Sequence, residues 1–237
     1  MRVLCWFSCG DASAVAAKLA IEKYGDSCEI LYCDTFAYEH PDNKRFFNDV
    51  QTWLEREIKI LKSEKYSDIY DVFEKTRFLR SRQGARCTTE LKKNVRKSYQ
   101  TVDDIHVFGF TAEESHRVER FYKENTDIKA EFPLLDNKIT KLSCHKIIRD
   151  AGIELPAMYK LGYHNNNCIG CVKGKKGYWN KIRVDFPDAF ERMAKLERKL
   201  NFSLCDTFLD QLPPNAGNYK KEPDIECGIL CISDDVL

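Results

Sequence analysis

Apolar and polar positions divide this chain into short apolar runs and longer amphipathic stretches. The apolar runs near residues 4–7, 28–35, 58–61 and 104–111 predict strands buried on both faces of a sheet. Between and after them, the spacing of apolar residues predicts helices over 44–57, 68–79, 140–150 and 190–200. This order predicts an α/β protein with a mostly parallel sheet flanked by helices, followed by a helical, cysteine-bearing extension.

Residues 4–19 combine a buried strand, a turn of small residues and the start of an alanine-rich helix. The first backbone N–H groups of such a helix have no acceptor within the helix and attract an anion such as phosphate. Ser8 and Ser13 add hydroxyl groups, and Gly10 lets the backbone approach a ligand closely. An ordinary strand–turn–helix unit without a ligand is the alternative reading of the same residues.

Length and composition limit the possible functions. The 237 residues suit one domain, alone or with a small appendage, and the net charge of +1 gives no general attraction to nucleic acid. No signal-peptide pattern and no apolar run of membrane-spanning length are present, so we expect a cytoplasmic protein without a membrane partner. In a reducing compartment, eleven cysteines indicate metal or sulfur chemistry rather than disulfides.

Two closely spaced cysteine pairs are candidate metal ligands. Cys168 and Cys171 have a ligand spacing in a polar, glycine-rich loop, and Cys227 and Cys231 form a second pair near the end of the chain. Together they provide four soft ligands, enough for zinc or a [4Fe–4S] cluster, and Cys87 in the basic segment 77–93 is a fifth candidate. The alternative is that all five are ordinary thiols.

The turn sequence Ser8–Cys9–Gly10–Asp11–Ala12–Ser13 resembles the Ser-Gly-Gly-x-Asp-Ser pyrophosphate loop (PP-loop) of the adenine nucleotide alpha-hydrolase superfamily. It is closest to the looser form of the phosphoadenosine phosphosulfate (PAPS) reductase family. Residues 132–171 also follow that family's order of Pro-Leu, helix, Leu-Pro, Gly-Tyr and Cys-x-x-Cys. Cys9 stands in place of a glycine, and Ala12 in place of the aspartate of ATP-cleaving members, which weakens the expectation of ATP hydrolysis more than that of nucleotide binding.

The resemblance implies a Rossmann-like nucleotide-binding domain over 1–163 and a cysteine-rich extension over 164–237. It also implies an adenine nucleotide ligand, either ATP, PAPS or its unphosphorylated form APS. Asp34 would contact the ribose or base, although a helix cap is an equal alternative. Basic and hydroxyl groups would bind the phosphate or sulfate, and the nucleotide-binding set is then Ser8, Cys9, Gly10, Asp11, Ser13, Asp34, Arg86, Lys92, Ser115 and Arg117.

The segment Glu226–Cys227–Gly228–Ile229 is similar to the C-terminal Glu-Cys-Gly-(Leu/Ile)-His motif of sulfonucleotide reductases. In that family the cysteine attacks the sulfur of the substrate, which makes Cys227 the candidate catalytic nucleophile, with a thioredoxin-like reductant clearing the product. The histidine of the motif is absent here, because Leu230 and Cys231 follow Ile229. That departure favours a ligand role for Cys227, with Cys87, Cys168, Cys171 and Cys231 as the other candidate ligands.

Three functions follow from these observations. The first is thiol-dependent reduction of a sulfonucleotide by a PAPS reductase-family oxidoreductase with an iron–sulfur or zinc centre. The second is ATP-dependent sulfur transfer to, or modification of, tRNA or DNA, in which the basic segment contacts the nucleic acid. The third is a nucleotide-binding module without turnover.

Overall fold

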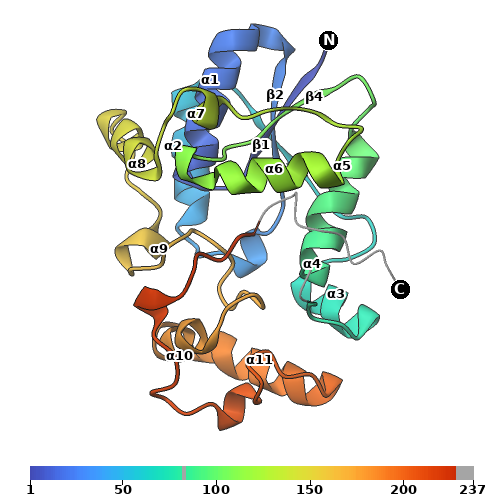
Figure 1. The fold of residues 1–237 in the computed structure, drawn as a ribbon, viewed down its shortest axis with the longest axis vertical. Helices are drawn as coiled ribbons and strands as arrows, with labels where there is room; N and C mark the ends of the chain where they lie inside the picture. The colour runs from blue at the N-terminus through green and yellow to red at the C-terminus, as the bar shows by residue number, and fades with distance from the viewer. Residues whose placement is uncertain (82–83, 228–237) are drawn as a thin grey trace. The chain divides into compact units, whose positions relative to one another are not determined.

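The structure, a computed structural model, describes residues 1–81 and 84–227 (Figure 1). The chain forms two compact units. The first contains residues 1–36, 41–62 and 95–166, and the second contains residues 37–40, 63–94 and 167–237. Most of the basic segment therefore groups with the extension that carries the later cysteines, although the sequence places it in the preceding domain.

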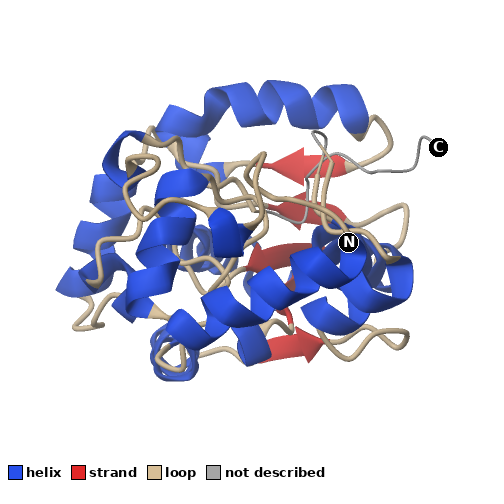
Figure 2. Ribbon diagram, turned by 90° about the horizontal axis from the view of Figure 1, so that it is seen from below, coloured by secondary structure: helices blue, strands red, loops and turns tan. Residues whose placement is uncertain are grey.

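The first unit is built on a five-stranded sheet. Its strands are β1 (Val3–Phe7), β2 (Cys28–Cys33), β3 (Ile58–Leu61), β4 (Ile105–Val107) and β5 (Lys129–Glu131). All pairings are parallel in the order β3-β2-β1-β4-β5, with Cys5 opposite both Ile30 and Val107. Figure 2 shows these strands in red between blue helices. The predicted α/β fold with a parallel sheet is confirmed, while β2 and β4 are shorter than predicted and β5 is an additional strand.

Helices cover this sheet because β1 and β2 are apolar on both faces. Val3, Cys5 and Phe7 share one core with the buried alanines of α1 (Asp11–Tyr24) and with Phe46 of α2 (Asn43–Leu54). Alternate residues of β1 point to the opposite face, where Trp6 and His106 stack with ring centroids 6.0 Å apart. The remaining helices of this unit are α5 (Asn94–Tyr99), α6 (Ser115–Glu124), α7 (Pro133–Asp136), α8 (Lys141–Asp150) and α9 (Ala157–Lys160).

The second unit is mainly helical. It contains α3 (Ile69–Thr76), α4 (Arg86–Thr88), α10 (Lys176–Asp185) and α11 (Pro187–Leu200). Trp179 and Met193, from α10 and α11, are fully buried in its core. The carboxylate of Glu197 accepts hydrogen bonds from the N–H groups of Leu204 and Leu209, which folds the chain after α11 back onto that helix. Within the described part of the chain, no helix combines the length and apolar character needed to span a bilayer.

Candidate functional site

The turn between β1 and α1 is held by the hydroxyl of Ser13. This oxygen accepts a hydrogen bond from the N–H of Ser8 at 3.1 Å and donates to the carbonyl of Gly10 at 2.8 Å. Cys9 is fully buried and has φ +54°, a left-handed conformation that favours glycine. The backbone therefore takes the path expected of a glycine at the position where the resembled loop has one.

Two glycines near this turn differ in what surrounds them. A Cβ on Gly109, just after β4, would lie 2.7 Å from the Cα of Ser13, so only glycine lets the end of β4 approach the start of α1. A Cβ on Gly10 would meet nothing nearer than the Tyr159 hydroxyl oxygen at 3.8 Å, an ordinary contact. Gly109 is thus needed for packing, whereas position 10 could accept a methyl group without a clash.

Asp11, the first residue of α1, is 1% exposed, with neighbouring side chains on two sides. The Tyr159 hydroxyl donates to one carboxylate oxygen at 2.7 Å, and Nε2 of His145 lies 3.2 Å from the other. Burial, followed by the charge of Asp11, raises the pKa of Tyr159 well above its usual value. Asp11 therefore links α8 and α9 to the start of α1 through its own side chain.

Asn166 completes the support of the turn. Its amide donates to the carbonyl of Cys9 at 2.6 Å and to the side-chain oxygen of Asn43 at 2.9 Å. Sequence reasoning missed Asn166, together with His145 and Tyr159, because each lies more than a hundred residues from the turn. No local pattern reports contacts over such separations.

The other nucleotide-binding candidates of the first unit, Asp34, Ser115 and Arg117, lie outside the β1–α1 turn. The carboxylate of Asp34 accepts from the N–H of Phe36 at 3.2 Å and pairs with Lys62 at 3.2 Å. Ser115 is exposed at the start of α6. Arg117 pairs with Glu114 and lies 4.1 Å from the ring centroid of Phe110. Thr111 and Glu114 form a capping box in the turn before α6.

In the second unit, four of the five candidate ligand cysteines come together: Cys87, Cys168, Cys171 and Cys227, here called the thiol cluster. Cys171 shares a hydrogen bond with Cys227 and interacts electrostatically with Cys168 and Cys87. Cys87 and Cys168 in turn each interact with Cys227. Segments far apart in sequence therefore contribute to one group of sulfur atoms. Cys231, the fifth candidate, lies outside the described residues.

Positively charged side chains near the thiol cluster lie closest to Cys227. The Nζ of Lys92 lies 4.0 Å from Sγ of Cys227, and the hydroxyl of Thr88 lies 3.9 Å from it. The hydrogen bond from Cys171 and the charges of Lys92 and Lys173 lower the pKa of Cys227 well below its usual value. Burial instead raises the pKa of Cys87 to about 12. Negative charge on this cluster is therefore best stabilised at Cys227.

Arg86, the remaining basic candidate, is engaged within its own helical segment. Its guanidinium pairs with the carboxylate of Glu90 at 2.8 Å, one turn later. Of the two basic residues that the sequence assigns to phosphate or sulfate in this segment, Lys92 lies against the thiol cluster and Arg86 is paired with an acidic neighbour.

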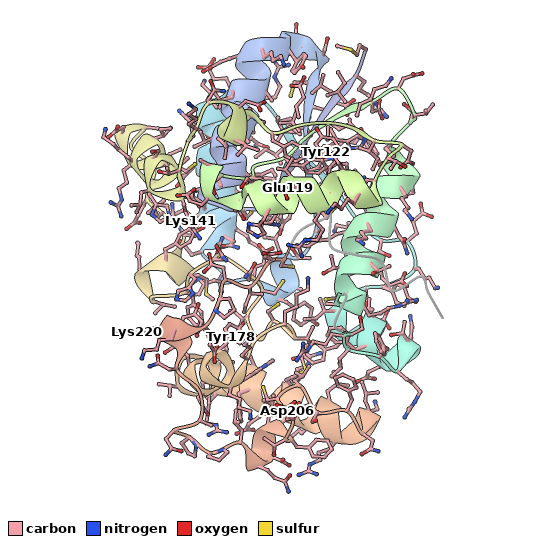
Figure 3. All side chains as sticks on the ribbon, viewed as in Figure 1. Glu119, Tyr122, Lys141, Tyr178, Asp206 and Lys220 are labelled. Atoms are coloured by element: carbon pink, nitrogen blue, oxygen red, sulfur yellow. The ribbon has the colours of Figure 1, made fainter. Side chains whose placement is uncertain are left out.

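Tyr178 of α10, labelled in Figure 3, holds the loop that carries Cys168 and Cys171. Its buried hydroxyl accepts from the N–H of Cys171 at 2.9 Å and donates to the carbonyl of Cys168 at 3.2 Å. A Cβ on Gly174 would lie 1.9 Å from the Tyr178 ring, so the loop can lie against this ring only with glycine at 174. One aromatic residue thus fixes both cysteines of the pair.

The segment before Cys227 is fastened to the region around α10. The carboxylate of Glu222 accepts from the N–H groups of Gly177 at 2.6 Å and Tyr178 at 2.9 Å, at the positive end of the helix. Closer to Cys227, Asn167 donates to the carbonyl of Ile225 and Lys173 to that of Glu226. These bonds bring the fourth thiol to the other three.

Among residues 1–81 and 84–227, no three His, Cys, Asp or Glu side chains have the arrangement needed to hold a single metal ion. The thiol cluster nevertheless offers four soft sulfur donors that interact with one another, with Cys171 buried and hydrogen-bonded to Cys227 and the other three thiols half-buried. No family model matches the chain, and a search of curated proteins finds no significant relative.

Proposed function

We propose that this protein is a metal–thiolate enzyme of the PAPS reductase type, acting on the sulfur of an adenine nucleotide. The observation that carries the proposal is the convergence of the thiol cluster from segments far apart in sequence. Plain core thiols have no reason to gather from separate segments beside two lysines. The residue resemblances to the PAPS reductase family support the same reading.

Cys87, Cys168 and Cys171 would hold the metal centre, and Cys227 would be the fourth ligand if it is not the attacking thiolate. Four thiols suit tetrahedral zinc or a [4Fe–4S] cluster, and either would require these side chains to rotate closer together than they now stand. When bound, an iron–sulfur centre would supply electron or sulfur chemistry. Lys92, Lys173 and the hydroxyl of Thr88 would offset the negative charge of the thiolates.

The adenine nucleotide would bind at the turn between β1 and α1. The N–H groups at the start of α1 and the hydroxyls of Ser8 and Ser13, which lie beside Gly10, suit a phosphate group. The buried contacts of Asp11 with Tyr159 and His145 give it a supporting role, so we assign the binding itself to backbone N–H groups and hydroxyls.

The first candidate reaction is sulfonucleotide reduction. A thiolate attacks the sulfate sulfur, the bond between sulfur and the phosphate oxygen breaks, and the nucleotide leaves. The enzyme sulfur then carries the sulfonate group, and one thiol of a dithiol reductant attacks that enzyme sulfur, which breaks the sulfur–sulfur bond and releases sulfite with formation of a mixed disulfide. The reductant's second thiol attacks the mixed disulfide, which frees the enzyme thiol and leaves the reductant as a disulfide, so that two electrons pass from the reductant's thiols to the sulfur released as sulfite. Cys227 beside Lys92 is this chain's candidate for the attacking thiolate.

The second candidate is ATP-dependent sulfur transfer to a nucleic acid. One observation favours it: Cys227 shares a hydrogen bond with Cys171, which places it among the other thiols rather than alone. A Cys227 committed to a metal centre would not be free to attack a substrate. Release of AMP and pyrophosphate in the presence of tRNA or DNA would identify this reaction.

Metal analysis of anaerobically purified protein tests the centre directly. About four irons per chain with a broad visible absorption would indicate a [4Fe–4S] cluster, and one zinc a structural site. We expect Cys87→Ser and Cys171→Ser to lose the metal, and Cys205→Ser to keep it, because Cys205 is a buried thiol of the same unit outside the thiol cluster. Metal-free wild-type protein after anaerobic purification would contradict the proposal.

The variant Cys227→Ser separates the two reactions. If Cys227 is the nucleophile, the variant keeps its metal but releases no sulfite from PAPS or APS with a dithiol reductant. If Cys227 is a ligand, metal and activity are lost together. Wild-type protein that releases neither sulfite nor AMP would exclude both reactions and leave a nucleotide-binding module.

A further inference from the structure

Arg96 of α5 is a buried guanidinium with unsatisfied donors. The residue is 2% exposed, and neither its Nε nor its Nη1 has a hydrogen-bond partner among the described residues. Unsatisfied donors on a buried charge destabilise a fold, because the water that they lose is not replaced. Such a group calls for a partner that the described part of the chain does not supply.

Arg2, in the same unit, shows how this fold satisfies an arginine. Its Nε and Nη2 donate to the two carboxylate oxygens of Asp104 at 2.9 and 2.6 Å, and Nη2 also reaches the carbonyl of Tyr99. Burial around Arg96, by contrast, lowers its pKa to about 10, and the charge of Asp127 only partly opposes that shift. Arg96 thus lacks the bidentate carboxylate that Arg2 has.

The charged and titratable groups around Arg96 lie on several elements. Tyr99, one turn later on α5, bonds to Glu29 at the amino end of β2. Arg96 itself interacts electrostatically with Cys33, the last residue of β2, and with His106 of β4. His106 provides no negative charge, and its Nδ1 already accepts a hydrogen bond from Trp6 at 2.9 Å.

We propose that Arg96 is an anion-binding residue, whose guanidinium takes a phosphate, sulfate or carboxylate group of a small ligand beside the carboxyl end of β2. The planar N–H donors of arginine match such oxyanions. Ligands of parallel sheets also bind at the carboxyl ends of the strands, where Cys33 lies. The chain keeps an unfavourable buried charge because the ligand compensates it. This site belongs to the first unit and does not depend on which group the thiol cluster holds.

The test compares wild-type protein with Arg96→Met and Arg2→Met. Melting temperatures of the full-length chain are measured with sodium phosphate, sulfate, pyrophosphate or AMP, each against sodium chloride of equal ionic strength. We expect at least one anion to stabilise wild-type protein and Arg2→Met in a saturable way. Arg96→Met should lose at least roughly tenfold in affinity for that anion and, without ligand, melt no lower than wild type, because an uncompensated charge has been removed.

Without ligand, Arg96→Met should therefore not lower the melting temperature, whereas Arg2→Met should lower it. Arg2→Met leaves the buried carboxylate of Asp104 without its positively charged partner and should melt lower than wild type. Arg96→Lys, which keeps the charge without the planar donor fork, should bind the anion with intermediate affinity. The pattern among phosphate, sulfate and AMP then identifies the group that the site prefers.

Three results would overturn the proposal. The first is that none of the four probes specifically raises the melting temperature of wild-type protein. The second is that a probe raises the melting temperature of Arg96→Met as much as that of wild type. The third is that ligand-free Arg96→Met melts well below wild type. The last would show a structural role for the guanidinium. Because the probes include inorganic anions, a loss of binding here is distinguishable from a failure of the proposed metal centre or reaction.

Discussion

The hydroxyl of Tyr178 accepts a hydrogen bond from the N–H of Cys171 at 2.9 Å. Through the same oxygen it donates to the carbonyl of Cys168, so one buried group sets the backbone of both cysteines. Tyr178→Phe should keep the ring but leave the N–H of Cys171 unpaired, which costs about 1–3 kcal/mol for a buried donor. We expect lower stability in urea unfolding and a lower metal content after anaerobic purification.

Tyr219→Phe is the control for this prediction, because Tyr219 packs near Tyr178 with ring centroids 6.1 Å apart and the substitution leaves the Tyr178 hydroxyl in place. Its metal content should stay at the wild-type level. A Tyr178→Phe protein with full metal content would show that the pair is held well enough without the hydroxyl.

Glu222 links the segment before Cys227 to the N-terminus of α10. Glu222→Ala removes a carboxylate that accepts from two backbone N–H groups, a capping loss of roughly 1 kcal/mol. We expect a faster loss of metal to a chelator, since Cys227 is then tethered less firmly. The matched control Glu191→Ala, at an exposed position of α11, should release metal at the wild-type rate.

Substitution by alanine should lower the stability of the protein at Gly109, which packs against the β1–α1 turn, but not at Gly10, which lies within that turn. Gly109→Ala places a methyl group 2.7 Å from the Cα of Ser13, and because backbone cannot move aside as a side-chain tip can, we expect a loss of roughly 2 kcal/mol or more in unfolding free energy. Gly10→Ala meets only contacts of 3.8 Å or longer and should fold normally.

The affinity of Gly10→Ala for a nucleotide tests whether the β1–α1 turn is the binding site. Gly10→Ala should weaken AMP binding in calorimetry while leaving stability within about 1 kcal/mol of wild type, because the methyl group adds bulk beside the hydroxyls of Ser8 and Ser13, where we propose that the phosphate binds. Unchanged affinity in Gly10→Ala would place the nucleotide elsewhere.

His106 predicts a pH dependence of stability. Burial, together with the charge of Arg96, lowers its pKa to about 4 from an ordinary value of 6.5. The unfolded chain therefore takes up the proton first, so the stabilising contribution is complete above pH 6.5 and is lost as pH falls toward 4. The slope should approach roughly 1.4 kcal/mol per pH unit within this window.

Urea unfolding at half-unit pH steps checks this slope. His106→Gln should flatten it between about pH 6.5 and 5, above the range in which most carboxylates titrate. His145→Gln, a change at a histidine beside Asp11, should retain it. If both variants keep the wild-type slope, another group is responsible for it.

The alternation of apolar runs and amphipathic stretches is sufficient to predict the parallel α/β fold, because β1, β2 and β3 each carry a recognisable apolar pattern. Strand β5 escapes prediction, since Lys129, Ala130 and Glu131 form no apolar run and pair with β4 only through tertiary placement. The strand predicted over 104–111 ends early at Val107, and Gly109 just beyond it packs closely against the start of α1.

Residue types in short motifs can indicate candidate sites, but not which side chains support them. The cysteine spacings point to metal ligands, and four of those cysteines lie together. Arg96 cannot be singled out in this way, because it stands in a run of basic residues typical of a solvated helix face. Only the fold shows that this arginine is buried while its basic neighbour Lys97 is exposed.

The close approach of Gly174 to the Tyr178 ring also constrains evolution. Because a Cβ at position 174 would lie only 1.9 Å from that ring, any larger residue at 174 requires a smaller one at 178, and the hydroxyl that holds the cysteine pair would then be lost. Positions 174 and 178 should therefore change together among homologous chains, and a chain that lacks both should also have replaced its cysteine pair.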